Sequence, residues 1–425
     1  MRPSLDLLQA VNWDFPTSLP GVGTSLHWYP GTFPNALPAT LIQAFTRPGA
    51  TVFDPYGGIG TTGFEAVRQE RNAIVVDANP VAATVSLFSC VLVTMQRLAP
   101  MYVAATLEEL GATVAQGDRV KQSILALPAV ESIELGAASK HLKSINNQIE
   151  RLLDQCVAGD PQISALAPWF HERTLKELLS LYRSVTSSEH SPFLRLAGLV
   201  MISAVLRPSS SQTASWGHVA DNVLPKDFKY KSVYLQCKLW LGKIGRVLRD
   251  IEIRPWDKGR IETSAVFRFN WLHEPTPDIR RFAGAVDLMV TSPPYASAID
   301  YTLSQRLSQY LFGFSDNEIM SLVNEEIGAR RKRFHSAPEE IWATHLASSL
   351  ESQLVLMKED GVICVILPHK DAGRHLGEAA FEVTMKGFGW RPIWSGSRSI
   401  RQSRTRQSWT SIQKEALLIF GGRGS

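Results

Sequence analysis

The chain has 425 residues, of which 44% are hydrophobic and 20% charged, and its formal net charge is +4. This ordinary globular composition excludes a disordered, collagen-like or coiled-coil protein, and the length suits two or three domains. The four cysteines are far apart and form no CxxC pair, which argues against a zinc ribbon or a disulfide framework. The first residues lack the apolar segment of a signal peptide, and the longest apolar stretch, roughly residues 81–95, is too short and too rich in serine and threonine to span a bilayer. We therefore expect a cytoplasmic protein with no membrane partner.

The first region, residues 1–95, alternates short apolar runs with glycine and proline. A helix is expected at 39–45. Strands ending near 53 and spanning 73–76, on either side of a helix at 61–69, have the pattern of one βαβ half-unit of an α/β sheet.

The second region, residues 96–255, is predicted to be helical because leucine and isoleucine recur in it at helical spacing. Arg207 and the Pro-Ser-Ser-Ser that follows it are expected to end one helix and open a polar loop reaching about residue 226. The third region, residues 256–425, returns to apolar strands: AVDLMVT, GVICVILPH and EALLIFGG. The expected architecture is one α/β domain assembled from both ends of the chain, with residues 96–255 as a large helical insertion.

A glycine-rich turn, FDPYGGIGTT, runs from Phe53 to Thr62 between the first strand and its helix. Glycines lack Cβ, so a ligand can approach the backbone closely. Asp77 ends the next strand, where an acid can accept hydrogen bonds from ribose hydroxyls. The turn is neither a GxGxxG fingerprint nor a Walker P-loop, which needs a lysine after its last glycine. It predicts a site for a nucleoside-containing cofactor, the alternative being a purely structural turn.

A second turn, Ser292-Pro293-Pro294-Tyr295, follows a buried strand. Ligands of open α/β sheets bind at the carboxyl ends of strands. Two prolines leave a stiff backbone that only accepts hydrogen bonds, so the Pro293 carbonyl and the Ser292 hydroxyl can accept from one exocyclic amine while Tyr295 offers a flat face to its base. Such an amine is a poor nucleophile, and two acceptors stabilise the charge that develops during its attack. This chemistry needs no metal, cysteine or histidine base; the alternative is a proline-rich turn after an edge strand.

Together these motifs resemble the amino-methyltransferases of DNA, which use S-adenosylmethionine to methylate cytosine N4 or adenine N6. The family's DPFxGxGTT motif corresponds to residues 54–62, with Tyr56 in place of phenylalanine, and its [SDN]PP[YFW] motif corresponds to residues 292–295. The stretch YPGTFP at 29–34 is similar to the family's HPAxFP-type segment, which closes over the methionine end of the cofactor. The resemblance covers about residues 25–82 and 260–300, and more loosely 355–422. It implies a Rossmann-like methyltransferase fold, whose sheet is mostly parallel with an antiparallel last strand.

The resemblance also implies the site residues. The catalytic residues would be Ser292, Pro293, Pro294 and Tyr295. S-adenosylmethionine would be bound by Tyr29, Thr32, Phe33, Asp54, Pro55, Tyr56, Gly58, Gly60, Thr61, Thr62, Asp77 and Asn270. Asn270 stands where the family often has an aspartate near the adenine, and a merely structural role is its alternative.

Serine as the first residue of the catalytic motif favours cytosine N4, and the continuation SPPYASAIDY is similar to bacterial cytosine-N4 enzymes. Asp300 is expected to cap the following helix. The prediction is a site-specific enzyme that methylates N4 of a flipped-out cytosine in duplex DNA. The alternatives are an adenine-N6 enzyme, an RNA base methyltransferase, and a methyltransferase-like DNA-binding subunit without activity.

Two basic segments are the predicted DNA contacts, through phosphates or guanine edges: Arg330, Arg331, Lys332 and Arg333, and Arg398, Arg401, Arg404 and Arg406. Their alternative is an ordinary solvated surface. The helical insertion is a further candidate for sequence recognition. We expect a monomer on duplex DNA, with a restriction or defence system as a possible partner.

Overall fold

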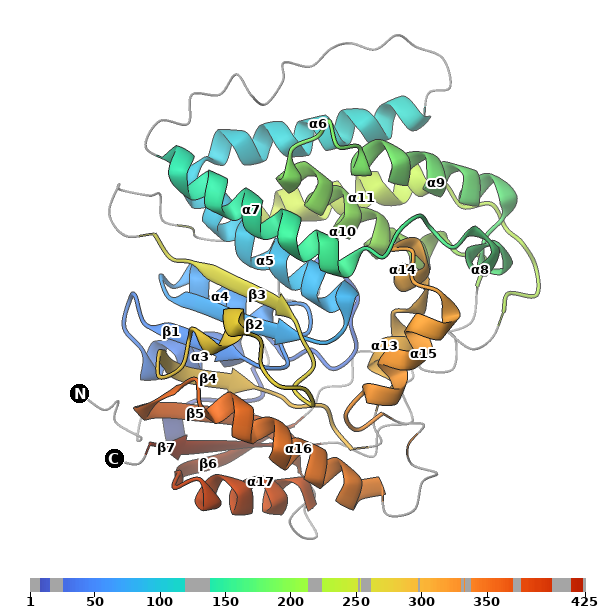
Figure 1. Ribbon diagram of the computed structural model, residues 1–425. Coiled ribbons are helices and arrows are strands. Elements are labelled where there is room, and N and C mark those ends of the chain that lie inside the picture. Colours follow the sequence, from blue (N-terminus) through green and yellow to red (C-terminus); the bar gives the residue numbers. More distant parts are fainter. Residues whose placement is uncertain are drawn as a thin grey trace.

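The computed structural model describes residues 8–15, 26–118, 138–212, 224–250, 253, 261–296, 299–329, 332, 338–369, 376–399 and 414–422. Within these ranges, one sheet lies between two layers of helices, and a group of further helices lies beyond one edge of the sheet (Figure 1).

The sheet has seven strands in the order β3-β2-β1-β4-β5-β7-β6. Strands β1 to β5 pair in parallel, whereas β7 is antiparallel to both of its neighbours, β5 and β6. The Rossmann-like fold with an antiparallel last strand is therefore confirmed. The strands are β1 (Thr51–Asp54), β2 (Asn72–Asp77), β3 (Ser264–Arg268), β4 (Val286–Thr291), β5 (Met357–His369), β6 (Arg391–Ser399) and β7 (Lys414–Gly421).

Helices cover both faces of the sheet, so its central strands are apolar on both sides. In β4, Leu288 and Val290 belong to one hydrophobic cluster and Met289 to the other. The first cluster includes α3 (Ala36–Phe45), α4 (Thr61–Arg68) and α5 (Pro80–Leu98); the second includes α16 (Pro338–Leu354) and α17 (Leu376–Gly387) (Figure 1).

The helical group between α5 and β3 packs directly on α5 and shares its hydrophobic cluster, so it has no separate core among the described residues. It consists of α6 (Pro100–Asp118), α7 (Ser139–Cys156), α8 (Ile163–Leu166), η3 (Ala167–Trp169), α9 (Glu172–Thr186), α10 (Pro192–Ser209) and α11 (Val233–Asp250). Helix α10 ends at Ser209, within the Arg207-Pro-Ser-Ser-Ser stretch that was expected to end a helix, and Pro208 lies in its last turn. Two described helices, α5 and α10, are long and apolar enough to span a membrane, and both are mostly buried in the core.

Three short helices follow the Ser292–Tyr295 turn, whose predicted role is catalytic, and lie beyond the carboxyl ends of the parallel strands (Figure 1). They are α13 (Tyr301–Ser304), α14 (Arg306–Leu311) and α15 (Asp316–Glu325), while α12 (Pro277–Arg280) precedes β4. Asp300 stands at the expected N-cap position of α13, but its side chain makes no capping hydrogen bond there.

The glycine-rich turn is constrained by its packing, and this gives a stability prediction. Gly60 has φ +82°, and an added Cβ would lie 2.8 Å from Cα of Ser86 in α5. Gly60→Ala should therefore lower the free energy of unfolding by at least about 2 kcal/mol, measured by chemical denaturation. Gly242→Ala in α11 is the control, because no described atom lies within 4 Å of its added Cβ and helical alanine is favoured over glycine by about 0.5–1 kcal/mol. Equal effects of the two substitutions would contradict this account of the turn.

Candidate active site

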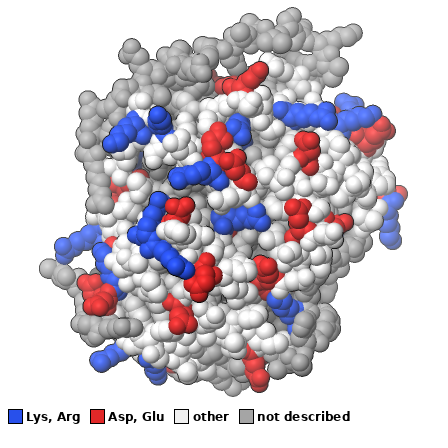
Figure 2. Space-filling model, viewed as in Figure 1, with Lys and Arg blue, Asp and Glu red and all other residues white. Residues whose placement is uncertain are grey.

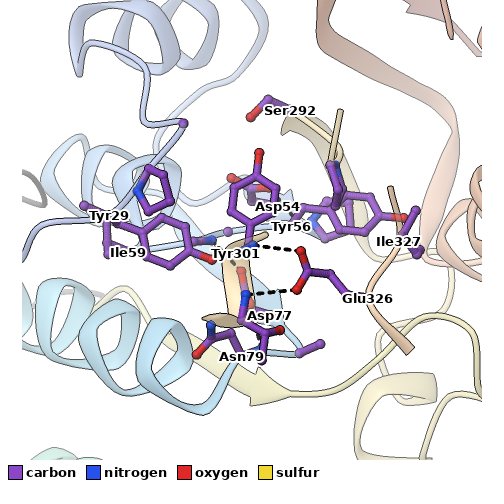
Figure 3. Close-up of a pocket in the computed structure, with 18 of the residues that line it drawn as sticks. Tyr29, Asp54, Tyr56, Ile59, Asp77, Asn79, Ser292, Tyr301, Glu326 and Ile327 are labelled. Carbon is purple, nitrogen blue, oxygen red and sulfur yellow. Dashed lines mark hydrogen bonds between the residues drawn. The ribbon is translucent and has the colours of Figure 1, made fainter. Parts of the chain in front are cut away.

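One cavity lies at the carboxyl ends of β1, β2, β3 and β4, where an open α/β sheet is expected to bind its ligand. It is lined by the glycine-rich turn, the aromatic segment around Tyr29, the ends of β2 and β3, the catalytic turn and helix α15. In the view of Figure 3, Ser292 lies at one side of this space and Asp77 and Asn79 at the other. The two sequence motifs therefore share one cavity.

The glycine-rich turn is fixed to the end of β2 by Asp77. One carboxylate oxygen accepts from the backbone N–H of Gly58 at 2.8 Å and the other from the N–H of Asn79 at 2.8 Å. Gly58 has φ +52°, and an added Cβ would lie 3.3 Å from the ring of Tyr29, on the side of the cavity. Burial raises the pKa of Asp77 to about 7, although the two N–H groups oppose that shift.

Asp54, at the end of β1, joins the glycine-rich turn to the catalytic strand. Its carboxylate accepts from the hydroxyl of Thr62 at 2.7 Å, the hydroxyl of Thr291 at 2.8 Å and the N–H of Tyr56 at 3.2 Å. Because Thr291 directly precedes Ser292, one carboxylate sets the spacing of both turns. The side chain is 2% exposed, and burial raises its pKa to about 6.

Two tyrosines and a glutamate close the cavity on the side of α13 and α15. The rings of Tyr29 and Tyr301 are stacked with centroids 6.0 Å apart. Glu326 accepts from the N–H groups of Tyr301 and Thr302 at 2.8 and 2.9 Å, as the dashed lines in Figure 3 show. Burial raises the pKa of Glu326 to about 7. Two acids with weakened ionisation, Asp77 and Glu326, thus line the same cavity.

Hydrogen bonds fix the Ser292–Tyr295 turn on its far side. The indole N–H of Trp342 in α16 donates to the carbonyl of Pro294 at 2.8 Å, and the indole N–H of Trp271 donates to the carbonyl of Pro55 in the glycine-rich turn at 2.8 Å. The hydroxyl of Tyr295 donates to Glu415 at the start of β7 at 2.8 Å. The hydroxyl of Tyr295 is therefore positioned by a residue 120 positions further along the chain.

Most of the predicted catalytic and cofactor-binding residues meet at the cavity. Those that line it are Tyr29, Thr32, Phe33, Asp54, Pro55, Tyr56, Gly58, Thr61, Asp77, Asn270, Ser292 and Pro294. Four predicted residues are not in its lining: Gly60, Thr62, Pro293 and Tyr295. Gly60 packs on Ser86, and the hydroxyl of Thr62 serves Asp54, so both support the turn from behind.

Sequence reasoning did not identify several lining residues, notably Asn79, Trp271, Glu325 and Glu326. The amide of Asn270 lies 3.3 Å from Glu325, which places helix α15 against the end of β3. Asn79 follows the Asp77 strand by two residues and caps α5, a local signal that could have been read. The glutamates of α15 carry no signal of their own in the sequence.

Of the two basic segments predicted to contact DNA, the described part of the chain includes Lys332 and Arg398. Arg330, Arg331, Arg333, Arg401, Arg404 and Arg406 lie outside the described residues. Arg398 is 7% exposed and paired with Glu415, so it does not lie on the surface as a phosphate contact. Lys332 donates to the carbonyls of Asn324 and Glu326 at the end of α15. On the face in Figure 2, described basic and acidic side chains are interspersed over the surface.

Comparison with known proteins supports part of the resemblance. Residues 6–87 match a family model described as DNA methylase. The match ends shortly after the β2 strand that carries Asp77, so it includes the glycine-rich turn and not the catalytic turn. No curated protein matches the chain. Among solved structures, the rRNA methyltransferase aviRa from Streptomyces viridochromogenes aligns with 94% of this chain and 90% of its own, at 10% identity and a TM-score of 0.32.

Removing one donor from Asp54 should be costly. Thr291→Val keeps the side-chain shape but leaves a buried carboxylate oxygen with one hydrogen bond fewer, so the free energy of unfolding should fall by about 1–2 kcal/mol. Thr344→Val in α16 is the matched control, because its hydroxyl bonds to the carbonyl of Glu340 on an exposed helix face. Denaturant titrations of both variants test this. A Thr291→Val protein as stable as the control would show that Asp54 does not depend on that bond.

Proposed function

We propose that this chain is an S-adenosylmethionine-dependent DNA methyltransferase that methylates the exocyclic N4 of a flipped-out cytosine in duplex DNA. The observation that carries the proposal is the single cavity that joins the glycine-rich turn and Asp77 to Ser292. The match of residues 6–87 to the DNA methylase model supports the methyltransferase activity and DNA as the substrate. The choice of cytosine rests on Ser292 and on the AIDY continuation of its motif.

The residues of the cavity fit the proposed cofactor. The ionised Asp77 has acceptor capacity for ribose hydroxyls beyond its two backbone bonds, and the absent side chain of Gly58 leaves room beside Tyr29. Asn270, Phe269 and Leu322 lie together at the adjoining end of the cavity and suit an adenine. The segment from Tyr29 to Phe33 would cover the methionine end. When bound, the cofactor supplies an electrophilic methyl group on a sulfonium.

The catalytic turn would activate the amine by position and charge. The Ser292 hydroxyl and the Pro293 carbonyl would accept the two N–H groups of the cytosine amine, which stabilises the positive charge that grows on N4 as it attacks. Tyr295 would stack on the base, offsetting part of the few kcal/mol that extrusion from the duplex costs. The hydrogen bonds that Pro294 accepts from Trp342 and that Tyr295 donates to Glu415 would keep this turn in place before the base arrives.

Substitution of the catalytic turn should separate chemistry from cofactor binding. Ser292→Ala and Tyr295→Ala should lower methylation by at least about 100-fold, since an acceptor or the stacking surface is lost. S-adenosylmethionine binding by calorimetry should stay within about threefold, because neither side chain belongs to the cofactor end. Products would be measured by nucleoside mass spectrometry of mixed-sequence duplex DNA. N6-methyladenine in place of N4-methylcytosine would refute the assignment of the base, and lost cofactor binding would refute the assignment of these roles.

Cofactor binding should depend on pH around neutrality. The pKa of Asp77 is raised to about 7, so lowering the pH from 8 to 6 protonates its carboxylate. The protonated group has less capacity to accept hydrogen bonds from the ribose hydroxyls. The affinity for S-adenosylmethionine should fall by about tenfold over that range. Glu326, with a pKa also raised to about 7, should contribute to the slope. Calorimetry at pH 6, 7 and 8 would test this, and the Asp77→Asn, Glu326→Gln double variant should lose most of the slope, leaving only what Asp54 contributes near pH 6. A wild-type affinity that is constant over this range would contradict the assignment.

A further inference from the structure

A buried polar network links the catalytic turn to the last two strands of the sheet. Tyr295 donates to one carboxylate oxygen of Glu415, and the Nε of Arg398 lies 3.3 Å from the other. Arg398 in β6 and Glu415 in β7 are directly paired in the antiparallel register. Their side chains are 7% and 12% exposed, so the pair is largely withdrawn from water.

The network contains donors that the described residues do not use. Nε and Nη1 of Arg398 are both buried and without a hydrogen-bond partner among them, as is the Glu415 oxygen that faces Nε. Leaving a charged donor unpaired in the interior is costly, and such groups call for an explanation in a folded protein. Nε lies 3.3 Å from Glu415 in an ion pair, and Nη1 presents a further N–H group that no described residue accepts.

The position of this donor points to the target base. β6 runs in the same direction as β4, because both β5 and β6 are antiparallel to β7 and β5 is parallel to β4. Arg398, one residue before the end of β6, is therefore at the same edge of the sheet as Ser292, just past the end of β4. Arg398 does not line the cavity itself, but it reaches the turn that carries Ser292 through Glu415 and Tyr295, at the edge where open α/β sheets bind their ligands.

We propose that Arg398 is a base-reading residue that donates to N3 and O2 of the flipped-out cytosine, and that Glu415 positions it together with Tyr295. This inference rests on the proposed function. Cytosine carries two adjacent acceptors, N3 and O2, next to the amine that Ser292 would hold, and the planar guanidinium fork matches two adjacent acceptors. On its Watson–Crick edge, adenine presents a single acceptor, N1, beside its amine. The fork thus distinguishes the two bases and gives a physical basis for methylation of cytosine.

The first test changes the substrate. In the duplex site that the wild-type enzyme methylates, the target cytosine is replaced by 3-deazacytosine, which keeps the amine and O2 but has C–H in place of N3. We expect kcat/KM for the wild type to fall by about 10- to 100-fold, the discrimination typical of a paired contact to a base edge. A fall of less than threefold would overturn the role of Arg398 without needing any variant.

The second test removes the fork. Arg398→Lys keeps the charge near Glu415 but cannot reach two acceptors, so kcat/KM for cytosine should fall by about 10- to 100-fold while S-adenosylmethionine affinity is unchanged. In this variant, replacing the target cytosine by 3-deazacytosine should lower kcat/KM by a further factor of less than about three, because the contact to N3 is already lost. Arg391→Lys, at the exposed opposite end of β6, is the matched control and should keep the full penalty.

The outcomes separate the inference from the function. A full 3-deazacytosine penalty in Arg398→Lys would show that the penalty comes from the chemistry of the analogue and would overturn the inference, while leaving the proposed function intact. Glu415→Gln keeps an acceptor for Tyr295 but loses the ion pair, and should reduce the penalty in part; this variant decides the question should Arg398→Lys not fold. A wild type that makes no N4-methylcytosine would instead refute the proposed function itself.

Discussion

The buried carboxylate of Asp54 is the constraint on which the geometry of the site depends. It accepts hydrogen bonds from the glycine-rich turn through Thr62 and from the end of the catalytic strand through Thr291. A methyl transfer in line between two ligands requires that their separate binding turns be held at one distance. Between the neighbouring strands β1 and β4, this single side chain accepts hydrogen bonds from both turns and so sets their separation. Three donors compensate for its burial, which nevertheless raises its pKa to about 6.

Several buried acids lie at the same edge of the sheet, and their ionisation destabilises the folded protein. The pKa values of Asp54, Asp77 and Glu326 are raised to about 6, 7 and 7, mainly by burial. The native state therefore binds protons more tightly than the unfolded chain, whose carboxyls titrate near pH 4, and these groups reduce the free energy of unfolding as the pH rises from about 4 to 7. A cationic ligand with hydroxyl donors would stabilise the ionised carboxylates of Asp77 and Glu326 at neutral pH. Two acids whose ionisation destabilises the unliganded protein can in this way favour ligand binding.

The sequence predicted the parts of the site that are local in the chain. The glycine-rich turn, Asp77 and the Ser292 turn each follow an apolar strand within a few residues, so pattern and spacing place them at one edge of a parallel sheet. Pattern and spacing could not find Glu326, Trp342 and Glu415. Their hydrogen-bond partners are Tyr301, Pro294 and Tyr295, which lie 25 to 120 positions away along the chain. The partners of Arg398 and Lys332 were hidden for a related reason: a cluster of basic residues does not reveal that one side chain pairs with a buried glutamate and another bonds to the carbonyls at the end of a helix.

The helical group is bound to the cofactor side of the site rather than appended to it. His27 bonds to Ser203 of α10 at 2.8 Å, and the guanidinium of Arg207 lies 3.4 Å from the centroid of the Trp28 ring. Burial lowers the pKa of His27 to about 4, so this contact is neutral at physiological pH and is not broken by ordinary acidification. His27 and Trp28 directly precede Tyr29, whose ring borders the cavity. The segment proposed to cover the cofactor therefore takes its position from α10, and a chain without the insertion would lose the support of that segment as well as the packing on α5.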